Sequence, residues 1–476
     1  MSPTPESRTT AAAIDAIMRA VGEKGAIADA QGMAPYLEEQ RGQYHGTARV
    51  VVRPASTEEV AAVVRICAET HVPIVPQGGN TGLVGAAVPR SGDAIVLSLA
   101  RMNRVRAIDP LDFTITVEAG CVLADVQRAA AGADRLFPLS LGAEGSCMIG
   151  GNLATNAGGT EALAYGIARS HALGLEVVLA DGRVLPNLNK LKKDNTGYDL
   201  NNLFIGAEGT LGVITAAVLR LLPRPRSVET AFLGVVSPQA ALDLLGLASE
   251  RTAGGITSFE LMSREGIELV LCHGAGCRDP LPDAHPWYVL IELSSQAGSG
   301  LRAVLEELLA EGLERGLVAD ATIAGSLDQT KMFWRIRELM GEVQRQEGGS
   351  IKHDISVPVA AVPAFITEAN AACARLIAGA RPIPFGHLGD GNIHYNVMQP
   401  LGADKAAFLA RWDEVNAAVF AAVAKYGGSI SAEHGIGALK RDLLPKVKDP
   451  VAYELMRTLK RVLDPKGILN PGKVLM

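Results

Sequence analysis

Two histidines flank a tight-turn signal in residues 385–396, which read FGHLGDGNIHYN. Asp390-Gly391 is a strong signal for a two-residue hairpin turn, and a turn there would place His387 directly opposite His394. Directly opposed side chains in a hairpin have β carbons about 4.5–5.5 Å apart. Two imidazoles at that separation could share one divalent cation. The alternative is a pair of surface or hydrogen-bonded histidines beside a turn.

Strand alternation divides the rest of this hairpin into two faces. Asn392 and Asn396 fall on the histidine face, while Leu388, Ile393 and Tyr395 fall on the other face, which suits packing. The segment contains no evident third metal ligand, so these residues alone leave both alternatives open.

A further acid and histidine are adjacent in residues 431–437, SAEHGIG. On a regular strand Glu433 and His434 would point to opposite faces, but the glycines that follow allow a loop in which both face one site. The alternative is a solvated Glu-His pair at a junction between a helix and a loop.

The first of two glycine-rich segments, residues 76–85 (PQGGNTGLVG), follows an expected strand at 72–76. Glycine amides approach an anion without a β carbon in the way, and Asn80 and Thr81 add hydrogen-bonding groups. These features favour a phosphate or pyrophosphate. The segment is not a nicotinamide fingerprint, because residues 84–89 do not begin a helix. A glycine-rich turn packed between strands is the alternative.

The second glycine-rich segment, residues 141–159, holds six glycines, two asparagines, Ser146 and Thr155, with almost no charge. A polar loop of this length has little reason to exist unless its amides coordinate something. A large, partly anionic cofactor that lies along both segments would account for the pair.

The elements that must position these groups change character near residues 223–225. Before this point Ser56 opens a helix and Asp181-Gly182 forms a tight turn, with further strands expected at 94–99, 114–118, 175–179 and 212–221. After it, the sequence predicts amphipathic helices at 238–250, 300–315 and 405–426 and a strand at 287–293. The mixture predicts an α+β protein with more than one domain.

Composition narrows the class of protein. The 476 residues carry a net charge of −6, which gives no general attraction for polyphosphate, so we expect no nucleic-acid partner. No signal peptide and no run of about 20 apolar residues is evident, so we expect a cytoplasmic protein without a transmembrane segment. The six cysteines are scattered rather than arranged as a disulfide framework. Cys272, His273 and Cys277 raise a zinc alternative, but free and mostly buried thiols are the favoured interpretation.

Several motifs together resemble one family. They are residues 76–85, 145–159, DNTGYD at 194–199, FIGAEGTLG at 204–212 and NPGK at 470–473. The chain resembles flavoproteins of the vanillyl-alcohol oxidase type, most closely the FAD-dependent D-2-hydroxyacid dehydrogenases that act on D-2-hydroxyglutarate or D-lactate. The resemblance implies an α+β fold with three parts. These are a two-part FAD-binding domain at 1–225, a substrate (cap) domain with an antiparallel sheet at 226–426, and a C-terminal segment at 427–476 that returns to the flavin site.

The resemblance also implies how FAD is bound. The first loop would hold the pyrophosphate, the second would run under the ribityl chain and isoalloxazine, and residues 209–214 would line the flavin pocket. Relatives that attach FAD covalently carry histidine where this chain has Asn80, so noncovalent FAD is expected. The implied FAD-binding residues are Pro76, Gly78, Gly79, Asn80, Thr81, Gly82, Leu83, Gly142, Gly145, Ser146, Ile149, Gly150, Asn152, Thr155, Asn156, Gly158, Gly209, Val213, Ile214 and Asn470.

The catalytic assignments follow from the same resemblance. His387, His394 and Glu433 would bind a divalent metal, with zinc expected, and His434 would be the base. Arg337 and Lys352 match positions that hold substrate carboxylates, and Asn392 would be a substrate or supporting group. Relatives often carry a hydroxyl residue where this chain has Gly341, which bears on the choice of substrate.

The implied reaction is oxidation of a small D-2-hydroxy acid to the 2-oxo acid, with hydride passing to flavin N5. D-2-hydroxyglutarate is favoured over D-lactate because residues 191–200 look more like the hydroxyglutarate branch. An electron-transfer flavoprotein, a quinone or a cytochrome would take the electrons, and the resemblance leaves a homodimer open. The alternatives are a related glycolate-type FAD oxidase and, in a different class, a metal-dependent hydrolase or metal-binding module without flavin.

Overall fold

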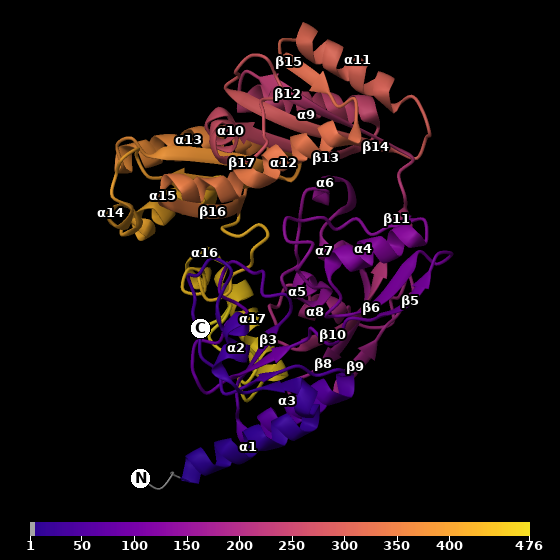
Figure 1. The fold of residues 1–476 in the computed structure, drawn as a ribbon, viewed down its shortest axis with the longest axis vertical. Helices are drawn as coiled ribbons and strands as arrows, with labels where there is room; N and C mark the ends of the chain where they lie inside the picture. The colour runs from indigo at the N-terminus through magenta and orange to yellow at the C-terminus, as the bar shows by residue number, and fades with distance from the viewer. Residues whose placement is uncertain (1–4) are drawn as a thin grey trace. The chain divides into compact units, whose positions relative to one another are not determined.

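The computed structural model describes residues 5–476 and divides the chain into two compact units (Figure 1). The first unit contains the chain up to residue 158, together with residues 167–224 and 433–476. The second contains residues 159–166 and 225–432. Each unit therefore takes in segments that are distant in sequence.

A small, mostly parallel sheet begins the first unit. Its strand order is β1 (Ala26–Ile27), β2 (Val51–Val52), β4 (Ile95–Ser98) and β3 (Ile74–Gln77), and β4 runs parallel to both β2 and β3. Helix α3 (Thr57–Thr70) packs with this layer, and its first turn is capped because Ser56 accepts a hydrogen bond from the Glu59 amide. The expected helix start at Ser56 is confirmed.

A second sheet of the first unit is antiparallel. Its order is β5 (Val105–Asp109), β6 (Thr114–Glu118), β10 (Val213–Arg220), β8 (Ala172–Val178) and β9 (Val184–Asn187). The turn between β8 and β9 falls at Asp181-Gly182 as expected, with Gly182 at a φ of +80°. Helix α4 (Leu123–Gly132) packs into the apolar core of this sheet.

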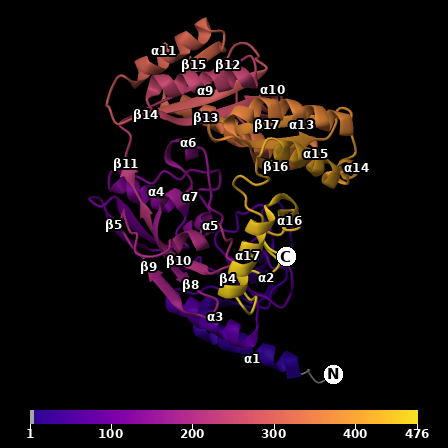
Figure 2. The same cartoon turned by 180° about the vertical axis from the view of Figure 1, so that it is seen from behind.

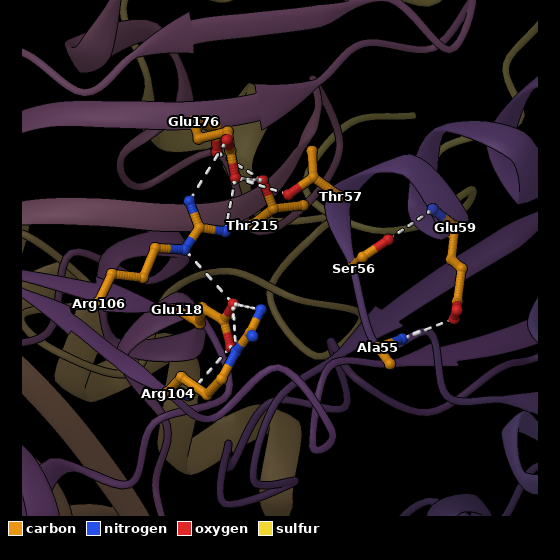
Figure 3. A network of polar contacts seen from close by, with 9 residues as sticks. All are labelled: Ala55, Ser56, Thr57, Glu59, Arg104, Arg106, Glu118, Glu176 and Thr215. Carbon is orange, nitrogen blue, oxygen red and sulfur yellow. Dashed lines mark hydrogen bonds and ion pairs between the residues drawn. The ribbon is translucent and has the colours of Figure 1, made fainter.

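A network of carboxylates, arginines and hydroxyl groups connects the two layers of the first unit (Figure 3). Arg106 lies between Glu118 and Glu176, with nitrogen–oxygen distances of 3.3 and 3.1 Å. Glu176 also accepts hydrogen bonds from Thr57, at the start of α3, and from Thr215 on β10. Glu118 is fully buried, and the hydrogen bonds that it accepts from Arg104 and Arg106 offset the cost of removing its charge from water.

The second unit is built on a seven-stranded antiparallel sheet. The order is β15 (Val318–Ile323), β12 (Ser227–Val235), β14 (Trp287–Ser295), β13 (Ile256–Ser263), β17 (Arg381–His387), β18 (Asn392–Met398) and β16 (Ser350–Ser356). One face packs against α9 (Pro238–Thr252), α11 (Leu301–Glu314), α13 (Val362–Leu376) and α15 (Trp412–Lys425) (Figure 1). The other face is partly covered by α10 (Arg264–His273) and α12 (Leu327–Val343).

Shorter elements complete the two units. In the first they are η1 (Glu23–Gly25), α1 (Pro5–Val21), α2 (Ala30–Leu37), β7 (Arg135–Leu136), α5 (Ile149–Ala154), α7 (Ala168–His171), α8 (Asn201–Phe204), β11 (Leu222–Pro223), α16 (Leu444–Val447) and α17 (Pro450–Leu463). In the second they are α6 (Ala162–Tyr165), η2 (Gln344–Glu347), η3 (Val359–Ala361), η4 (Leu388–Asp390) and α14 (Lys405–Leu409).

The C-terminal segment of the first unit is coloured yellow in Figures 1 and 2. After α17, Leu469 forms a parallel bridge with Ile74 at the start of β3, and the Asn470 amide donates to the Ile74 carbonyl at 2.7 Å. The end of the chain is therefore bonded to the strand that precedes the first glycine-rich loop.

The α+β class predicted from the sequence is confirmed, but two local predictions outside the histidine hairpin were wrong. The helix expected at 405–426 is two helices, α14 and α15, because Arg411 leaves the helical path and donates to the Leu376 carbonyl at the end of α13. The second glycine-rich segment is not a continuous loop, because it contains α5. Gly150 lets this helix lie against Ala119, where a β carbon would stand 2.7 Å away.

Within the described part of the chain, residues 5–476, no helix has both the length and the apolar character needed to cross a membrane.

Candidate active site

The β17–β18 hairpin has a different register from the one its sequence predicts. His387 pairs with Asn392, and His394 pairs with Phe385. The predicted two-residue turn at Asp390-Gly391 was wrong, because the 3₁₀ turn η4 lengthens the connection to four residues. His387 and His394 are therefore diagonal neighbours rather than directly opposed partners.

The change of register leaves the two histidines on the same face. Opposed residues share a face of a sheet, so His387, Asn392, His394 and Asn396 all lie on the side away from the main core. The ring centroids of His387 and His394 are 5.7 Å apart. On the opposite face Leu388, Ile393 and Tyr395 are buried in the core, as expected.

Glu260 holds one side of the His387 ring. It lies directly opposite His387 on β13, and its Oε1 is 2.7 Å from His387 Nδ1. The other carboxylate oxygen, Oε2, accepts a hydrogen bond from Arg337 Nε at 2.6 Å. Glu260 is fully buried, and Arg337 and His387 are each only about 6% exposed. These three residues form a buried polar unit in the centre of the sheet.

The charge state of Glu260 follows from its two partners. Burial by itself raises the pKa of this carboxyl, but the interactions with His387 and Arg337 outweigh burial and hold the pKa well below its usual range. The carboxylate is therefore ionised at neutral pH and accepts from both neighbours. In a neutral ring, an Nδ1–H that points at this carboxylate puts the lone pair of His387 on Nε2.

The structure places the predicted carboxylate-binding residues on or beside this face. Arg337 projects from α12 with its guanidinium 5.0 Å from the Phe385 ring centroid, and only its Nε is bonded to Glu260. Lys352 lies on β16 as expected, and its ammonium donates to the Gly341 carbonyl at 2.5 Å. A β carbon added at Gly341 would meet nothing closer than Phe385 at 3.8 Å.

Asn392 is buried beside the histidines. Its Nδ2 donates to Asp354 Oδ1 at 3.0 Å and to the Ile355 carbonyl at 2.9 Å. Among the described residues no group donates to its Oδ1. A buried amide oxygen of this kind can accept a hydrogen bond from a bound ligand.

Sequence reasoning missed Glu260, although a signal was present. The strand Ile256–Ser263 reads ITSFELMS, in which one acid interrupts a buried pattern. A carboxylate in a fully buried strand requires partners. The partners, His387 and Arg337, come from segments 127 and 77 residues away, so the pattern alone does not identify them.

In the first unit the two glycine-rich loops pack directly against each other. A β carbon at Gly79 would lie 2.1 Å from the Ser146 carbonyl oxygen, and one at Gly78 would lie 3.5 Å from the Gly151 amide nitrogen. By contrast, a β carbon at Gly82, Gly142, Gly145 or Gly151 would meet no protein atom within 4 Å. Some of the glycines therefore allow the loops to meet, and others leave the backbone open to a ligand.

Most polar side chains of these loops stabilise the loops themselves. Asn80 has a φ of +54° and donates through Nδ2 to the Pro35 and Glu38 carbonyls. Asn156 accepts from the Arg169 amide, and Asn152 donates to the Cys147 sulfur at 3.5 Å. Thr155 and Ser146 donate to carbonyls within their own segment. The loops would therefore bind a cofactor mainly through backbone amides and through the exposed backbone at glycines.

Glu208 joins several segments expected at the flavin site and was not singled out from the sequence. Its carboxylate accepts from the amides of Ile436 at 2.7 Å and Gly437 at 2.8 Å. Its carbonyl accepts from Asn470 Nδ2 at 2.8 Å. Burial raises the pKa of Glu208, with partial compensation from these amides. The adjacent Gly209 has a φ of +70° and lies against Pro76, and Val213 and Ile214 are buried at the start of β10.

The C-terminal residues bond to the first loop. Asn470 donates to the Ala86 carbonyl, while its buried Oδ1 has no partner among the described residues. Lys473 is buried and donates to the carbonyls of Gly85 and Val88. Burial, together with the charge of Arg90, lowers the pKa of Lys473 to about 8.

Glu433 and His434 belong to the first unit. An added β carbon at Gly158, near the end of the second glycine-rich loop, would lie 3.3 Å from Glu433 Oε1. The backbone just beyond His434 is fixed by Glu208, and Gly435 and Gly437 both have positive φ. The glycines therefore shape a loop here, as the sequence predicts. This loop runs beside the second glycine-rich segment.

The cysteine alternative has little support. His273 bonds to Glu347 at 3.0 Å, and Cys272 and Cys277 are absent from the ligand-type clusters found among residues 5–476. Four thiols are buried (Cys67, Cys121, Cys147 and Cys373) and all six are free, as expected. Burial raises the pKa of Cys67 to about 12 and that of Cys121 to about 11.

Comparison with known protein families identifies the family to which this chain belongs. Residues 224–474, more than half of the chain, match the family described as FAD linked oxidases, C-terminal domain. Residues 48–186 match the FAD binding domain. The chain belongs to the FAD-linked oxidase family. This membership makes it an FAD-dependent oxidoreductase and confirms the family resemblance found in the sequence.

Several relatives within the family are named D-2-hydroxyglutarate dehydrogenase. A Rattus norvegicus protein named D-2-hydroxyglutarate dehydrogenase, mitochondrial, is 42% identical, with 90% of this chain and 78% of that protein covered. A probable D-2-hydroxyglutarate dehydrogenase of Oryza sativa subsp. indica is 40% identical, with 96% and 80% covered. A D-2-hydroxyglutarate dehydrogenase of Stutzerimonas stutzeri is 36% identical, with 98% and 99% covered. The chain belongs to this branch of the FAD-linked oxidases.

Solved structures agree on the fold. p-Cresol methylhydroxylase aligns with a TM-score of 0.76 at 16% identity, covering 99% of this chain and 98% of that one. Alkyldihydroxyacetonephosphate synthase aligns with a TM-score of 0.70 at 18% identity, covering 99% and 86%. The vanillyl-alcohol oxidase type of FAD-binding fold predicted from the sequence is confirmed.

Proposed function

We propose that this protein is a dehydrogenase that oxidises D-2-hydroxyglutarate to 2-oxoglutarate with noncovalent FAD and a divalent cation. The observation that carries the proposal is the polar face of the second unit, where Glu260 fixes His387 beside His394. The names of the relatives support the choice of substrate.

The first unit has the groups that FAD needs. Gly82, Gly145 and Gly151 present backbone unobstructed by side chains, and the buried Asn470 Oδ1 offers an acceptor. The backbone amides of both loops would hold the pyrophosphate, and the residues from Gly209 to Ile214 would lie along the flavin. Because Asn80 cannot form a covalent flavin bond, we expect FAD to be released on denaturation.

The donor types fit a zinc-like cation. His387 and His394 supply imidazoles, and Glu433 supplies a carboxylate as the proposed third ligand, a set that suits Zn²⁺. The hydrogen bond from His387 Nδ1 to Glu260 is the arrangement that metal-binding histidines commonly have.

Other residues would remove the hydroxyl proton and bind the substrate carboxylates. When bound, FAD accepts the C2 hydride at N5 and the cation lowers the pKa of the C2 hydroxyl. His434 would accept the hydroxyl proton, because an imidazole titrates near neutral pH. Arg337 and Lys352 would bind the substrate carboxylates, since a guanidinium and an ammonium each carry several hydrogen-bond donors. Asn392 Oδ1 would accept from the substrate.

Two finer assignments are part of the proposal. An electron-transfer flavoprotein, a quinone or a cytochrome would reoxidise the flavin, and a homodimer remains compatible with this scheme. We propose a cytoplasmic location, although the plant and animal relatives are named mitochondrial. The family assignment replaces the flavin-free hydrolase alternative.

Anaerobic titration of the purified yellow protein tests the proposal. D-2-Hydroxyglutarate should bleach the flavin absorption, while L-2-hydroxyglutarate should not, and D-lactate and glycolate should act more weakly. Bleaching by D-lactate or glycolate at higher kcat/KM than D-2-hydroxyglutarate would contradict the substrate assignment. Admitting air then separates the dehydrogenase from the oxidase alternative, because an oxidase reoxidises fast.

A further inference from the structure

Glu260 is the feature of the catalytic face that neither the sequence motifs nor the relatives' names account for. It is fully buried on β13, and its two carboxylate oxygens are bonded to different residues. Oε1 faces Nδ1 of His387, a proposed metal ligand, and Oε2 faces Nε of Arg337, a proposed substrate-binding residue. One side chain therefore contacts two groups with different proposed tasks.

The direction of the two hydrogen bonds is fixed by chemistry. An arginine guanidinium has donors and no acceptor, so Arg337 must donate to Oε2. An ionised carboxylate accepts at both oxygens, so His387 must donate from Nδ1 to Oε1. A neutral imidazole that carries its proton on Nδ1 has its lone pair on Nε2, the nitrogen on the opposite side of the ring.

We infer that Glu260 is a positioning residue that fixes the tautomer of His387 and the orientation of Arg337 together. This inference rests on the proposed function, in which His387 binds the cation and Arg337 binds a substrate carboxylate. Glu260 itself contacts neither. By holding His387 Nδ1 it makes Nε2 the nitrogen through which this ring would bind the cation, and by holding Arg337 Nε it orients the guanidinium for a substrate carboxylate.

A glutamine at this position gives a sharp test, because it has one acceptor oxygen instead of two. In Glu260→Gln that oxygen must face Arg337, which can only donate. The amide NH₂ then faces His387 Nδ1, which has to accept, so the ring proton moves to Nε2. An imidazole with a proton on Nε2 cannot offer that nitrogen to a cation.

Glu292 supplies a matched control on the same face of the neighbouring strand β14. Its partners, Trp334 Nε1 and Thr230 Oγ1, both donate to one oxygen, Oε2, at 3.0 Å. Glu292→Gln therefore keeps both hydrogen bonds and has no link to His387. It controls for the loss of a carboxylate from the sheet of the second unit.

The experiment measures Co²⁺ affinity of the flavin-loaded protein by equilibrium dialysis and by visible absorption. We expect Glu260→Gln to bind Co²⁺ about 10–100-fold more weakly than wild type, and Glu292→Gln to bind within about twofold of wild type. Unchanged Co²⁺ affinity in a folded, flavin-loaded Glu260→Gln protein would overturn the inference.

A second measurement does not depend on a folded variant. Nitrogen-15 spectra of the histidine rings in the metal-free, flavin-loaded wild type report which ring nitrogen carries a proton, with His387 assigned by the signal lost in His387→Gln. A proton on His387 Nδ1 supports the inference, and a bare Nδ1 refutes it. A wild type that takes up no Co²⁺ would remove the metal from the proposed function, while the ring spectra still decide the role of Glu260.

Discussion

Glu260 and His387 are directly opposed on the neighbouring strands β13 and β17, and the carboxylate lies 2.7 Å from the histidine Nδ1. The pair is buried, and Arg337 balances its charge from α12. Strand register thus determines which nitrogen of His387 is bonded to Glu260. The β17–β18 hairpin adds His394 to the same face as a diagonal neighbour.

Removal of the proposed base should separate catalysis from folding. His434→Ala should keep its FAD and its melting temperature, because nearby Glu208 still holds the loop through Ile436 and Gly437. Loss of a general base lowers turnover by about 100- to 10,000-fold. Steady-state kinetics with D-2-hydroxyglutarate measures the loss. His273→Ala, which removes a histidine bonded to Glu347, serves as the control and should turn over within about twofold of wild type. Normal turnover in His434→Ala would exclude it as the base.

Two glycines of the first loop should respond differently to alanine. At Gly79 a β carbon would lie 2.1 Å from the Ser146 carbonyl, so Gly79→Ala should destabilise the flavin-free protein by about 1–3 kcal/mol through overpacking. At Gly82 a β carbon meets no protein atom within 4 Å. Gly82→Ala should therefore leave the flavin-free protein as stable as wild type but lower its FAD affinity. Urea unfolding and FAD titration provide the two readouts. Wild-type FAD affinity in Gly82→Ala would place the cofactor elsewhere.

The buried Lys473 should make stability rise with pH above neutrality. Its pKa is about 8 in the folded chain, mainly because of burial, against about 10.4 in the unfolded chain. Between these values the unfolded chain binds more protons, so the free energy of unfolding increases with pH. The full effect is on the order of 3 kcal/mol. Urea unfolding of wild type and Lys473→Met from pH 7.5 to 10 checks this, and parallel pH curves for the two proteins would contradict it.

Thiol reactivity should follow burial. Cys272 is exposed and Cys277 is half-buried, whereas burial raises the pKa values of Cys67, Cys121 and Cys147. Iodoacetamide at pH 8 should therefore label Cys272 first in the native protein, and all six thiols only after denaturation. Mass spectrometry of digested protein locates the label. Early labelling of Cys67 would show that the core around α3 opens.

The sequence was most informative where chemically reactive residues lie within one local element, such as a hairpin. Alternation along the strand was enough to place His387 and His394 on one face, even though the turn was misassigned. It could not identify the four-residue connection, because η4 is stabilised by Leu388 packing into the core of the second unit. Asp-Gly signals a tight turn but does not report the tertiary contact that lengthens it.

The roles of residues whose partners are distant in sequence could not be predicted from the sequence. Glu260 and Glu208 each appear as a single acid in an apolar or glycine-rich segment, and their roles depend on partners from 77 to 262 residues away. In the same way Arg411 ends a helix because it bonds to Leu376. Local periodicity reports which face is buried, but it does not report which polar groups meet there.

The proposed catalysis depends most directly on a cation that activates the hydroxy acid on the face of His387 and His394. The decisive measurement is the single-turnover rate of flavin reduction by D-2-hydroxyglutarate in protein stripped of metal and then reloaded with Zn²⁺. We expect the rate to fall at least about 100-fold on stripping, in line with several kcal/mol of charge stabilisation by a bound metal, and to recover on reloading. An unchanged rate in protein shown to be metal-free would contradict the account.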